Sequence, residues 1–460
     1  MFDLIIKNVN IVLPKSILFG SVAVKNEKIA AIFSSGCFDS EMPAHQVIDG
    51  KGFHLLPGGV DPHVHIRYPA FSHRETFITG TQAAAAGGTT TILEHPVSVP
   101  PQFNQEILNN RGKLVEEQAL IDVGFLGAAG FEHLDCISDL AKGGIYGYKT
   151  FLHDAPKGAE SSFEGMTSKN TGELLEIVKE VGKTNLLLAA HTEDNELVTA
   201  GIAQMMPECD KPISHCKSRP PLVEVLAVQK LLTLAKYTGA RTYLVHISVP
   251  EAVEIALQAR RDGQEVYIET CPQYLYRDES YLERFGALAK NTPPLRARNV
   301  VDGMWKYIED GSIDVVASDH GPYSIEEKLR NPTNIFDSPN GYAGIEVRIP
   351  LMLNAVREKR ISLHRAVEML CSNPAKVFGI KNKGEIKIGY DADFILIDLD
   401  YQYRLDHTKF YTKGREACSF MDGEDATGKI LKTIVRGKVV FNGSTFDVAP
   451  GYGKWLKKEV

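Results

Sequence analysis

Short apolar runs alternate with amphipathic segments through the middle of this chain, from about residue 55 to about residue 380. The pattern predicts strands over residues 89–93, 121–126, 145–151, 186–190, 242–247, 266–269 and 313–317. Between them apolar residues recur every three to four positions, as in residues 221–237 and 250–261, and both of these segments open on a proline suited to a first helical turn. Together with a strand leading into residues 61–67, this makes eight strand–helix units and predicts a (β/α)8 TIM-like barrel.

An open doubly wound sheet is the competing α/β fold. Neither Gly-x-Gly-x-x-Gly nor Gly-x-x-x-x-Gly-Lys-Ser/Thr occurs in the sequence, so no nucleotide-binding motif supports that fold. Short strand-like runs occupy both ends of the chain, at residues 4–12 and 22–24 and again at residues 389–397 and 434–440. We therefore expect a barrel over residues 55–380 and a small β-sandwich built from both termini, residues 1–54 plus 381–460.

The composition is that of an ordinary globular protein, with 43% apolar and 24% charged residues. A net charge of -7 and the lack of basic runs argue against nucleic acid or an anionic membrane surface as a partner. No apolar run reaches membrane-spanning length, and the chain opens on a strand-like pattern instead of a signal peptide. We expect a cytoplasmic protein.

The cysteines are also typical of a protein of the reducing cytosol. They are Cys37, Cys136, Cys209, Cys216, Cys271, Cys371 and Cys418. They are scattered, odd in number and contain no Cys-x-x-Cys pair, which disfavours structural disulfides and a thiolate zinc site. Any metal ion must then be held by nitrogen and oxygen ligands.

Residues able to bind a metal ion end several of the predicted strands. They are His63, His65, Lys149, His191, His246 and Asp319. His63 and His65 stand two positions apart on a strand, so their side chains share one face. The carboxyl ends of barrel strands meet at one mouth, where catalytic residues lie. A single histidine after an apolar run is usually a packed core residue, but six such residues at successive strand ends predict a metal site.

Lys149 lies within the apolar stretch 146–152, where its ammonium would lose most of its hydration. An unpaired buried lysine is costly and tends to lose its charge. Two outcomes are consistent with the sequence. One is a salt bridge, and the other is reaction of the neutral amine with carbon dioxide to form a carbamate, whose two oxygens can bridge two cations.

Eight motifs follow one another in the order Pro-Gly-Gly-Val-Asp-Pro-His-Val-His (57–65), Ala-Ala-Ala-Ala-Gly-Gly-Thr-Thr-Thr (83–91), Tyr-Lys-Thr-Phe (148–151), Ala-His-Thr-Glu (190–193), Val-His-Ile-Ser (245–248), Glu-Thr-Cys-Pro-Gln-Tyr (269–274), Pro-Pro-Leu-Arg (293–296) and Ala-Ser-Asp-His (317–320). In these motifs nearly the whole chain resembles the cyclic amidohydrolases of the amidohydrolase superfamily: dihydroorotases, hydantoinases, dihydropyrimidinases and allantoinases. The resemblance implies a homodimer or homotetramer.

The resemblance also implies a binuclear metal centre. His63, His65, Asp319 and Lys149 as N6-carboxylysine would hold one divalent ion, and the same carbamate would hold the second together with His191 and His246. Zinc is the expected metal, although the same ligands accept manganese or cobalt. A hydroxide between the ions would be the nucleophile. Asp319 would be catalytic, taking the proton of the hydroxide and delivering it to the departing nitrogen.

Arg67 bears on the substrate. It resembles the arginine with which dihydroorotases bind a substrate carboxylate, since a guanidinium can form paired hydrogen bonds to that group. A salt bridge at the rim of the site is the alternative. The loop at residues 94–100 lacks the asparagine that dihydroorotases carry there, so their second carboxylate contact is missing.

Other stretches resemble different members of the group. Residues 218–224 are similar to allantoinases, and residues 340–348 are similar to hydantoinases and dihydropyrimidinases. In the latter enzymes backbone groups at the positions of Thr292 and Asn340 contact the cyclic amide, although each residue could equally be part of a loop turn. Asp154 replaces a tyrosine that contacts substrate in those enzymes.

The chain is therefore predicted to be a metal-dependent hydrolase that opens the C–N amide bond of a cyclic amide or ureide, allantoinase-like or hydantoinase-like. A dihydroorotase acting on a carboxylate-bearing ring is the alternative. A non-catalytic dihydropyrimidinase-like scaffold is the alternative of another class. Such scaffolds have lost metal ligands, whereas all six ligand positions are filled here, which favours catalysis.

Overall fold

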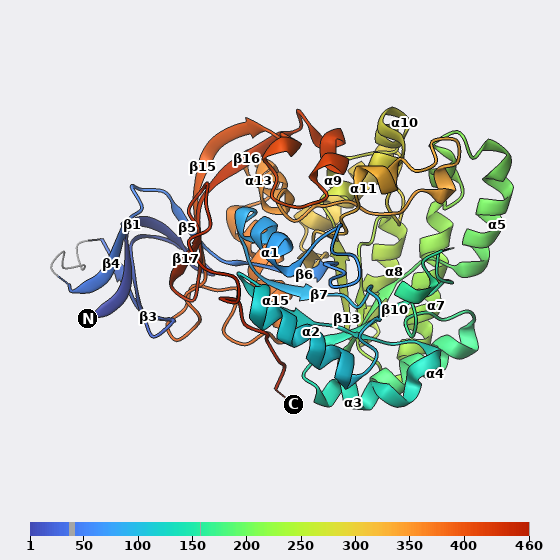
Figure 1. The fold of residues 1–460 in the computed structure, drawn as a ribbon, viewed down its shortest axis with the longest axis horizontal. Helices are drawn as coiled ribbons and strands as arrows, with labels where there is room; N and C mark the ends of the chain where they lie inside the picture. Colours follow the sequence, from blue (N-terminus) through green and yellow to red (C-terminus); the bar gives the residue numbers. More distant parts are fainter. Residues whose placement is uncertain (36–41, 157, 460) are drawn as a thin grey trace.

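The computed structural model describes residues 1–35, 42–156 and 158–459. Cys37 lies outside the described residues, and the six cysteines within them are free thiols. In Figure 1 a ring of helices surrounds short central strands, and a separate group of strands from both chain ends stands beside it. None of the described helices is both long enough and apolar enough to cross a membrane.

The central strands form a closed parallel barrel. They are β6 (Gly59–Val64), β7 (Thr89–Glu94), β8 (Asp122–Phe125), β9 (Gly127–Ala128), β10 (Gly147–Phe151), β11 (Leu187–His191), β12 (Thr242–Leu244), β13 (Val266–Thr270) and β14 (Val315–Val316). One sheet has the order β6-β7-β8 and the other has the order β9 to β14, every pair parallel. A parallel bridge between Val64 and His320 joins β6 to the segment after β14 and closes the ring. β8 and β9 are separated only by Leu126 and together fill one strand position, between β7 and β10, so the barrel has eight positions and the predicted (β/α)8 fold is confirmed.

Helices connect these strands and cover the barrel. They are α1 (Phe77–Ala86), α2 (Gln105–Gln118), α3 (Ile137–Lys142), α4 (Thr171–Gly182), α5 (Asn195–Met205), α6 (Ser214–Lys217), α7 (Pro221–Thr238), α8 (Pro250–Arg261), α9 (Gln273–Tyr276), α10 (Ser280–Phe285), α11 (Arg298–Glu309), α12 (Ile325–Lys328), α13 (Arg348–Arg357), α14 (Leu363–Val367) and α15 (Asn373–Phe378). Both α7 and α8 begin at the prolines that the sequence pattern singled out, since a first-turn residue needs no hydrogen-bonding N–H.

The strands of both chain ends meet in one sheet. They are β1 (Phe2–Val12), β2 (Ile17–Lys25), β3 (Lys28–Ser34), β4 (Ala44–Asp49), β5 (His54–Pro57), β15 (Phe394–Arg404), β16 (Asp425–Val435) and β17 (Lys438–Phe441). Their order is β17-β16-β15-β5-β1-β2-β3, with β4 also paired to β1. The antiparallel pairing of β5 with β15 is the link between the two ends, seen where blue and red strands lie side by side in Figure 1. The division into domains at residues 54 and 381 stays a prediction.

Candidate metal centre

The predicted ligands approach one another at the carboxyl ends of the barrel strands. Asp319 Oδ1 lies 3.2 Å from His63 Nε2 and 3.4 Å from His65 Nε2. On the other side, His191 Nδ1 lies 3.0 Å from His246 Nε2. The rings of His63 and His246 are 5.4 Å apart between centroids, which joins the two pairs. The structure thus brings these five residues to one buried centre.

Lys149 comes from β10, next to the strand of His191, and its side chain is almost completely buried, with 1% exposed. Its ammonium lies 4.7 Å from the centre of the Phe151 ring. Burial lowers the pKa of Lys149 to about 8, although Asp319 and Glu269 act in the opposite direction. Among the described residues Lys149 forms no ion pair, so the salt bridge that the sequence left open finds no carboxylate.

Two buried glutamates orient the histidines. Glu269 Oε1 accepts a hydrogen bond from His63 Nδ1 at 2.8 Å, and Glu193 Oε2 accepts one from His191 Nε2 at 2.8 Å. Because each carboxylate holds the proton on one ring nitrogen, the other nitrogen keeps its lone pair for a cation. The free nitrogens are Nε2 of His63 and Nδ1 of His191, which are the atoms directed at Asp319 and His246.

Charge in the site favours neutral imidazoles. Burial lowers the pKa of His191 to about 3, and burial together with neighbouring cationic groups also lowers the pKa of His63 and His65. Burial alone would raise the pKa of Glu193, but the Arg219 guanidinium, 2.6 Å away, holds that pKa well below its usual range. The site therefore presents neutral nitrogen donors suited to Zn²⁺ beside an ionised Glu193, whereas burial raises the pKa of Glu269 to about 8.

Three residues of the mouth adopt left-handed backbone conformations. The φ angles are 59° at Arg67, 42° at His246 and 50° at Asp319. A non-glycine residue rarely occupies this region, and such residues cluster where function requires a particular side-chain direction. The strand β12 correspondingly ends at Leu244, before the predicted boundary, because the chain turns at His246.

Four further residues lie in the site although no sequence pattern had placed them there: His95, Glu193, Glu269 and His153. Nitrogens of His63, His65 and His95 lie within 4.8 Å of one another, as do ligand atoms of His153, His191 and Glu193. The His95 ring stacks on His63 at 3.9 Å. His95 directly follows β7, so the strand-end rule could have found it. The sequence also held a signal for Glu269, because this carboxylate lies inside the apolar strand predicted at residues 266–269.

Arg67 is buried close to this cluster and is not part of a rim salt bridge. Its Nη1 donates to the carbonyl of Pro322 at 3.0 Å, and its guanidinium lies 4.5 Å from the centre of the Tyr323 ring. Its backbone N–H donates to Glu94 Oε1 at 3.0 Å. Among the described residues no carboxylate pairs with the guanidinium, and its Nε has no partner.

Thr292 and Asn340 lie on neighbouring loops beside the Asp319 segment. The N–H of Gly341 donates to the carbonyl of Lys290 at 3.0 Å, and the N–H of Gly321 donates to the carbonyl of Tyr342 at 3.0 Å. Both Thr292 and Asn340 are half-buried, and the Asn340 Oδ1 has no hydrogen-bond partner.

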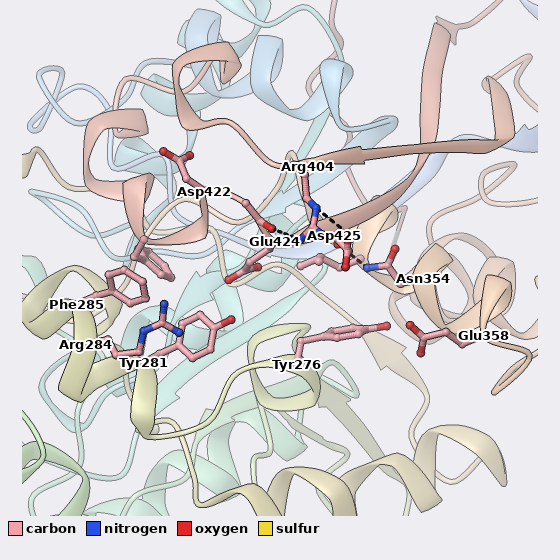
Figure 2. A pocket seen from close by; sticks show the side chains of 13 residues that line it. Tyr276, Tyr281, Arg284, Phe285, Asn354, Glu358, Arg404, Asp422, Glu424 and Asp425 are labelled. Atoms are coloured by element: carbon pink, nitrogen blue, oxygen red, sulfur yellow. Dashed lines mark hydrogen bonds and ion pairs between the residues drawn. The ribbon is translucent and has the colours of Figure 1, made fainter.

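A cavity of about 430 Å³ lies elsewhere, lined by residues of α9, α10, α13 and the segment leading into β16 (Figure 2). None of the predicted ligands lines it. Charged side chains around it are engaged with one another, because Glu424 accepts hydrogen bonds of 2.8 and 2.7 Å from the buried Arg277, and the exposed Arg404 lies 3.1 Å from Asp425. We assign this cavity no part in the chemistry of the metal centre.

Comparison with known proteins identifies the class of protein to which this barrel and its cluster of strand-end residues belong. The family model described as "Amidohydrolase family" matches residues 54–440. The chain belongs to this family.

Similarity to particular proteins covers the full length. An L-hydantoinase of Paenarthrobacter aurescens is 33% identical over 100% of this chain and 98% of its own length, and an allantoinase of Escherichia coli is 34% identical over 98% and 97%. The solved structure of an L-hydantoinase (dihydropyrimidinase) from Arthrobacter aurescens superimposes with a TM-score of 0.93 at 33% identity, covering 100% of both chains. That of a dihydropyrimidinase from Brevibacillus agri gives 0.89 at 28% identity, covering 100% and 99%. The predicted resemblance to cyclic amidohydrolases is confirmed.

Proposed function

We propose that this protein is a metal-dependent cyclic amidohydrolase, which hydrolyses the C–N amide bond of a cyclic amide or ureide in the manner of a hydantoinase or an allantoinase. One observation carries the proposal: His63 and His191 each donate one ring proton to a buried glutamate and direct the other nitrogen to a common centre. A merely packed histidine has no need of this arrangement. The names of the relatives support the same class of substrate.

The proposed ligands are those that the resemblance implied. His63, His65, Asp319 and Lys149 would hold one divalent ion, and Lys149, His191 and His246 would hold the other. Zn²⁺ is the proposed ion, with Mn²⁺ or Co²⁺ as substitutes. When bound, such ions would lower the pKa of water and polarise the amide carbonyl.

Lys149 would act as its carbamate, N6-carboxylysine. Burial already lowers its pKa to about 8, so a share of the amine is neutral near neutral pH. The nitrogen lone pair attacks the carbon of CO₂, one proton leaves the nitrogen, and an anion with two oxygens results. The lack of an ion pair around Lys149 supports this reading, because the added carbamate would meet imidazole nitrogens and no competing carboxylate bond would be broken.

Asp319 is the proposed proton carrier. Its Oδ1 lies within 3.4 Å of two imidazole nitrogens, and its side chain is 15% exposed, so it reaches both the centre and the open mouth. Burial raises the pKa of Asp319, which makes this carboxylate a better base than an exposed aspartate. It would take a proton from the attacking water and return it to the departing ring nitrogen.

Substrate recognition is assigned to Arg67 and to backbone groups at Thr292 and Asn340. The unpaired, buried guanidinium of Arg67 favours a second candidate, a ring that carries a carboxylate, as in a dihydroorotase. We also propose a homodimer or homotetramer, which size-exclusion chromatography with light scattering would test.

The deciding experiment measures ring opening of hydantoins, allantoin, dihydrouracil and dihydroorotate by the purified protein supplied with Zn²⁺, Mn²⁺ or Co²⁺ and bicarbonate. We expect turnover of at least one ring, its loss after chelation and its return with metal. A Lys149→Ala variant should bind less metal and lose activity. A metal-loaded protein inert towards the whole panel would favour the non-catalytic scaffold, and full activity after complete chelation would overturn the metal-dependent mechanism.

A further inference from the structure

Two lysines are buried behind the loops of Thr292 and Asn340. Lys290 is 2% exposed, and Lys328, the last residue of α12, is 0% exposed. Among the described residues neither one forms an ion pair with a carboxylate. A buried ammonium without a counter-ion is costly, so these positions require a reason beyond packing.

The Lys328 ammonium binds backbone carbonyls instead. Its Nζ donates to the carbonyls of Lys290 at 2.9 Å, Pro339 at 3.1 Å and Gly341 at 2.9 Å. Three acceptors match the three protons of an ammonium group. Lys290 completes the network, since its own Nζ donates to the carbonyl of Ser338. Two irregular loops, one at Lys290 and one at residues 338–341, are thereby joined by the two lysine side chains, in addition to the backbone hydrogen bond from Gly341 to Lys290.

We call the hydrogen bonds from Lys328 Nζ to the three carbonyls a clamp. The clamp lies next to the two residues that are predicted to contact the substrate. Asn340 lies between the two carbonyls of its loop that Lys328 binds, and Thr292 lies two residues after Lys290 in the other loop. The Asn340 Oδ1 is left without a partner. The same loop is tied to the metal centre, because the carbonyl of Tyr342 accepts a hydrogen bond from the N–H of Gly321, two residues after Asp319.

We propose that Lys328 is a positioning residue that sets the substrate affinity of this site, by clamping together the loops that present the backbone groups of Thr292 and Asn340 to the cyclic amide. This inference rests on the proposed function. The donors of the Lys328 amine matter because an apolar side chain would leave the carbonyls of Pro339 and Gly341 without the Nζ donor that they have here, and the carbonyl of Lys290 with only the N–H of Gly341. Irregular loops have no strand ladder that would satisfy these carbonyls.

The test compares Lys328→Met, Lys290→Met and, as a matched control, Lys306→Met, whose side chain on α11 is 68% exposed. We expect KM for the best cyclic substrate to rise about 10- to 100-fold in Lys328→Met and less in Lys290→Met, with kcat and metal content within about twofold of the parent protein. Lys306→Met should change neither constant. A folded, metal-loaded Lys328→Met variant with unchanged KM would overturn the proposal. A fall in kcat of about 10- to 100-fold at unchanged KM would overturn it as well.

A structural measurement separates failure of the clamp from failure of the proposed function. Hydrogen exchange of the Gly341 amide, which donates to Lys290, should become at least about tenfold faster in Lys328→Met and stay unchanged in Lys306→Met. This readout needs no turnover. Unchanged protection of Gly341 rejects the clamp even if the enzyme is active, and lost protection supports it even if no cyclic amide in the panel is hydrolysed. If Lys328→Met does not fold, Lys290→Met provides both measurements.

Discussion

Two buried clusters of ionisable residues lie at opposite ends of the barrel. The site cluster, at the carboxyl ends of the strands, consists of His63, His65, His95, Lys149, His191, His246 and Asp319. The junction cluster consists of Asp122, Lys383, Asp391, Asp393 and Arg436. Asp122 begins β8, so the junction cluster lies at the amino-terminal end of the barrel, where it meets the terminal sheet.

Both clusters bring potential metal ligands close together. Asp122, Asp391 and Asp393 have oxygens within 4.8 Å of one another, the same closeness as in the histidine groups. The Lys383 ammonium lies among them, at 2.7, 3.0 and 2.6 Å respectively. It occupies the place that a metal ion would take, and burial notwithstanding, the three carboxylates raise the pKa of Lys383.

The difference between the clusters is the pairing of charge. At the junction, Arg436 also pairs with Asp122, and Lys28, outside the cluster, pairs with Asp391, so every carboxylate of the cluster faces at least one cation. In the site cluster His191 Nδ1 faces His246 Nε2, and one carboxylate oxygen, Asp319 Oδ1, faces nitrogens of both His63 and His65. Lys149 forms no ion pair with any residue that the structure describes. Charged groups that stabilise a fold pair with one another, whereas the groups of a functional site keep atoms unpaired that can bind a metal ion or a substrate.

The largest expected effect is on the activity of a Lys149→Met variant. Removal of the proposed bridging ligand should lower kcat/KM at least about 10³-fold, because the proposed metal ions would stabilise the charge of the transition state by several kcal/mol. The free energy of unfolding of the metal-free protein should fall little or rise, since no ion pair is lost. Activity assays and urea unfolding would measure both. A large loss of stability would place Lys149 in the same class as Lys383.

The matched variant is Lys383→Met. It leaves three carboxylates, two of them buried, without their shared cation and should lower the free energy of unfolding by about 3–5 kcal/mol. The metal content and the kcat of the folded fraction should stay unchanged, because the junction lies at the other end of the barrel. Urea unfolding beside metal analysis tests this. A loss of metal in the folded protein would break the distinction between the two clusters.

Glu193→Gln probes how the histidines are oriented. The glutamine amide can donate as well as accept a hydrogen bond, so it no longer fixes the His191 proton on Nε2. The affinity for the metal ion should therefore fall about 10- to 100-fold. Competition with a chromophoric chelator measures the dissociation constant. Glu358→Gln, an exposed residue of the cavity in Figure 2, is the control and should leave it unchanged. Equal affinities in all three proteins would remove Glu193 from the metal centre.

Two buried arginines extend the comparison. Arg436 is paired with a carboxylate, whereas Arg67 pairs with none in the part of the chain that the structure describes. If Arg67 awaits a substrate carboxylate, Arg67→Met should raise KM about 10-fold for rings that carry a carboxylate and about twofold or less for neutral rings. Steady-state kinetics on dihydroorotate and on an unsubstituted hydantoin give the ratio. A uniform change for both substrates would assign Arg67 to packing.

The smallest effect concerns pH. Burial would raise the pKa of Asp122, but Lys383 and Arg436 outweigh it and hold that pKa below its usual value of 3.8. A depressed pKa in the folded state means that the stabilisation is complete above the unfolded pKa and is lost as pH falls below it. The difference in unfolding free energy between the protein and Asp122→Asn should be constant from about pH 5 to 8 and shrink by at most about 1.4 kcal/mol per unit below about pH 4. A difference that grew on acidification would contradict the pairing.

Much of the barrel and part of the site followed from local pattern. An apolar run followed by His63, His191 or His246 marks a strand and its end, and parallel strands deliver their ends to one mouth. Strand lengths were less predictable, since β12 and β14 are shorter than the apolar runs suggested. The chain adopts left-handed conformations at His246 and at Asp319, where side-chain direction overrides strand propensity.

The sequence by itself determined which residue types end the strands, and hence that nitrogen and oxygen donors gather at one mouth. Only the tertiary structure decided which of them are paired. Glu269 contacts His63 across 206 positions and Lys383 contacts Asp122 across 261, and no periodicity encodes such separations. The reason is physical: hydrophobic spacing is written along the chain and sets the elements, whereas the energy of a buried charge depends on the partner that folding brings to it.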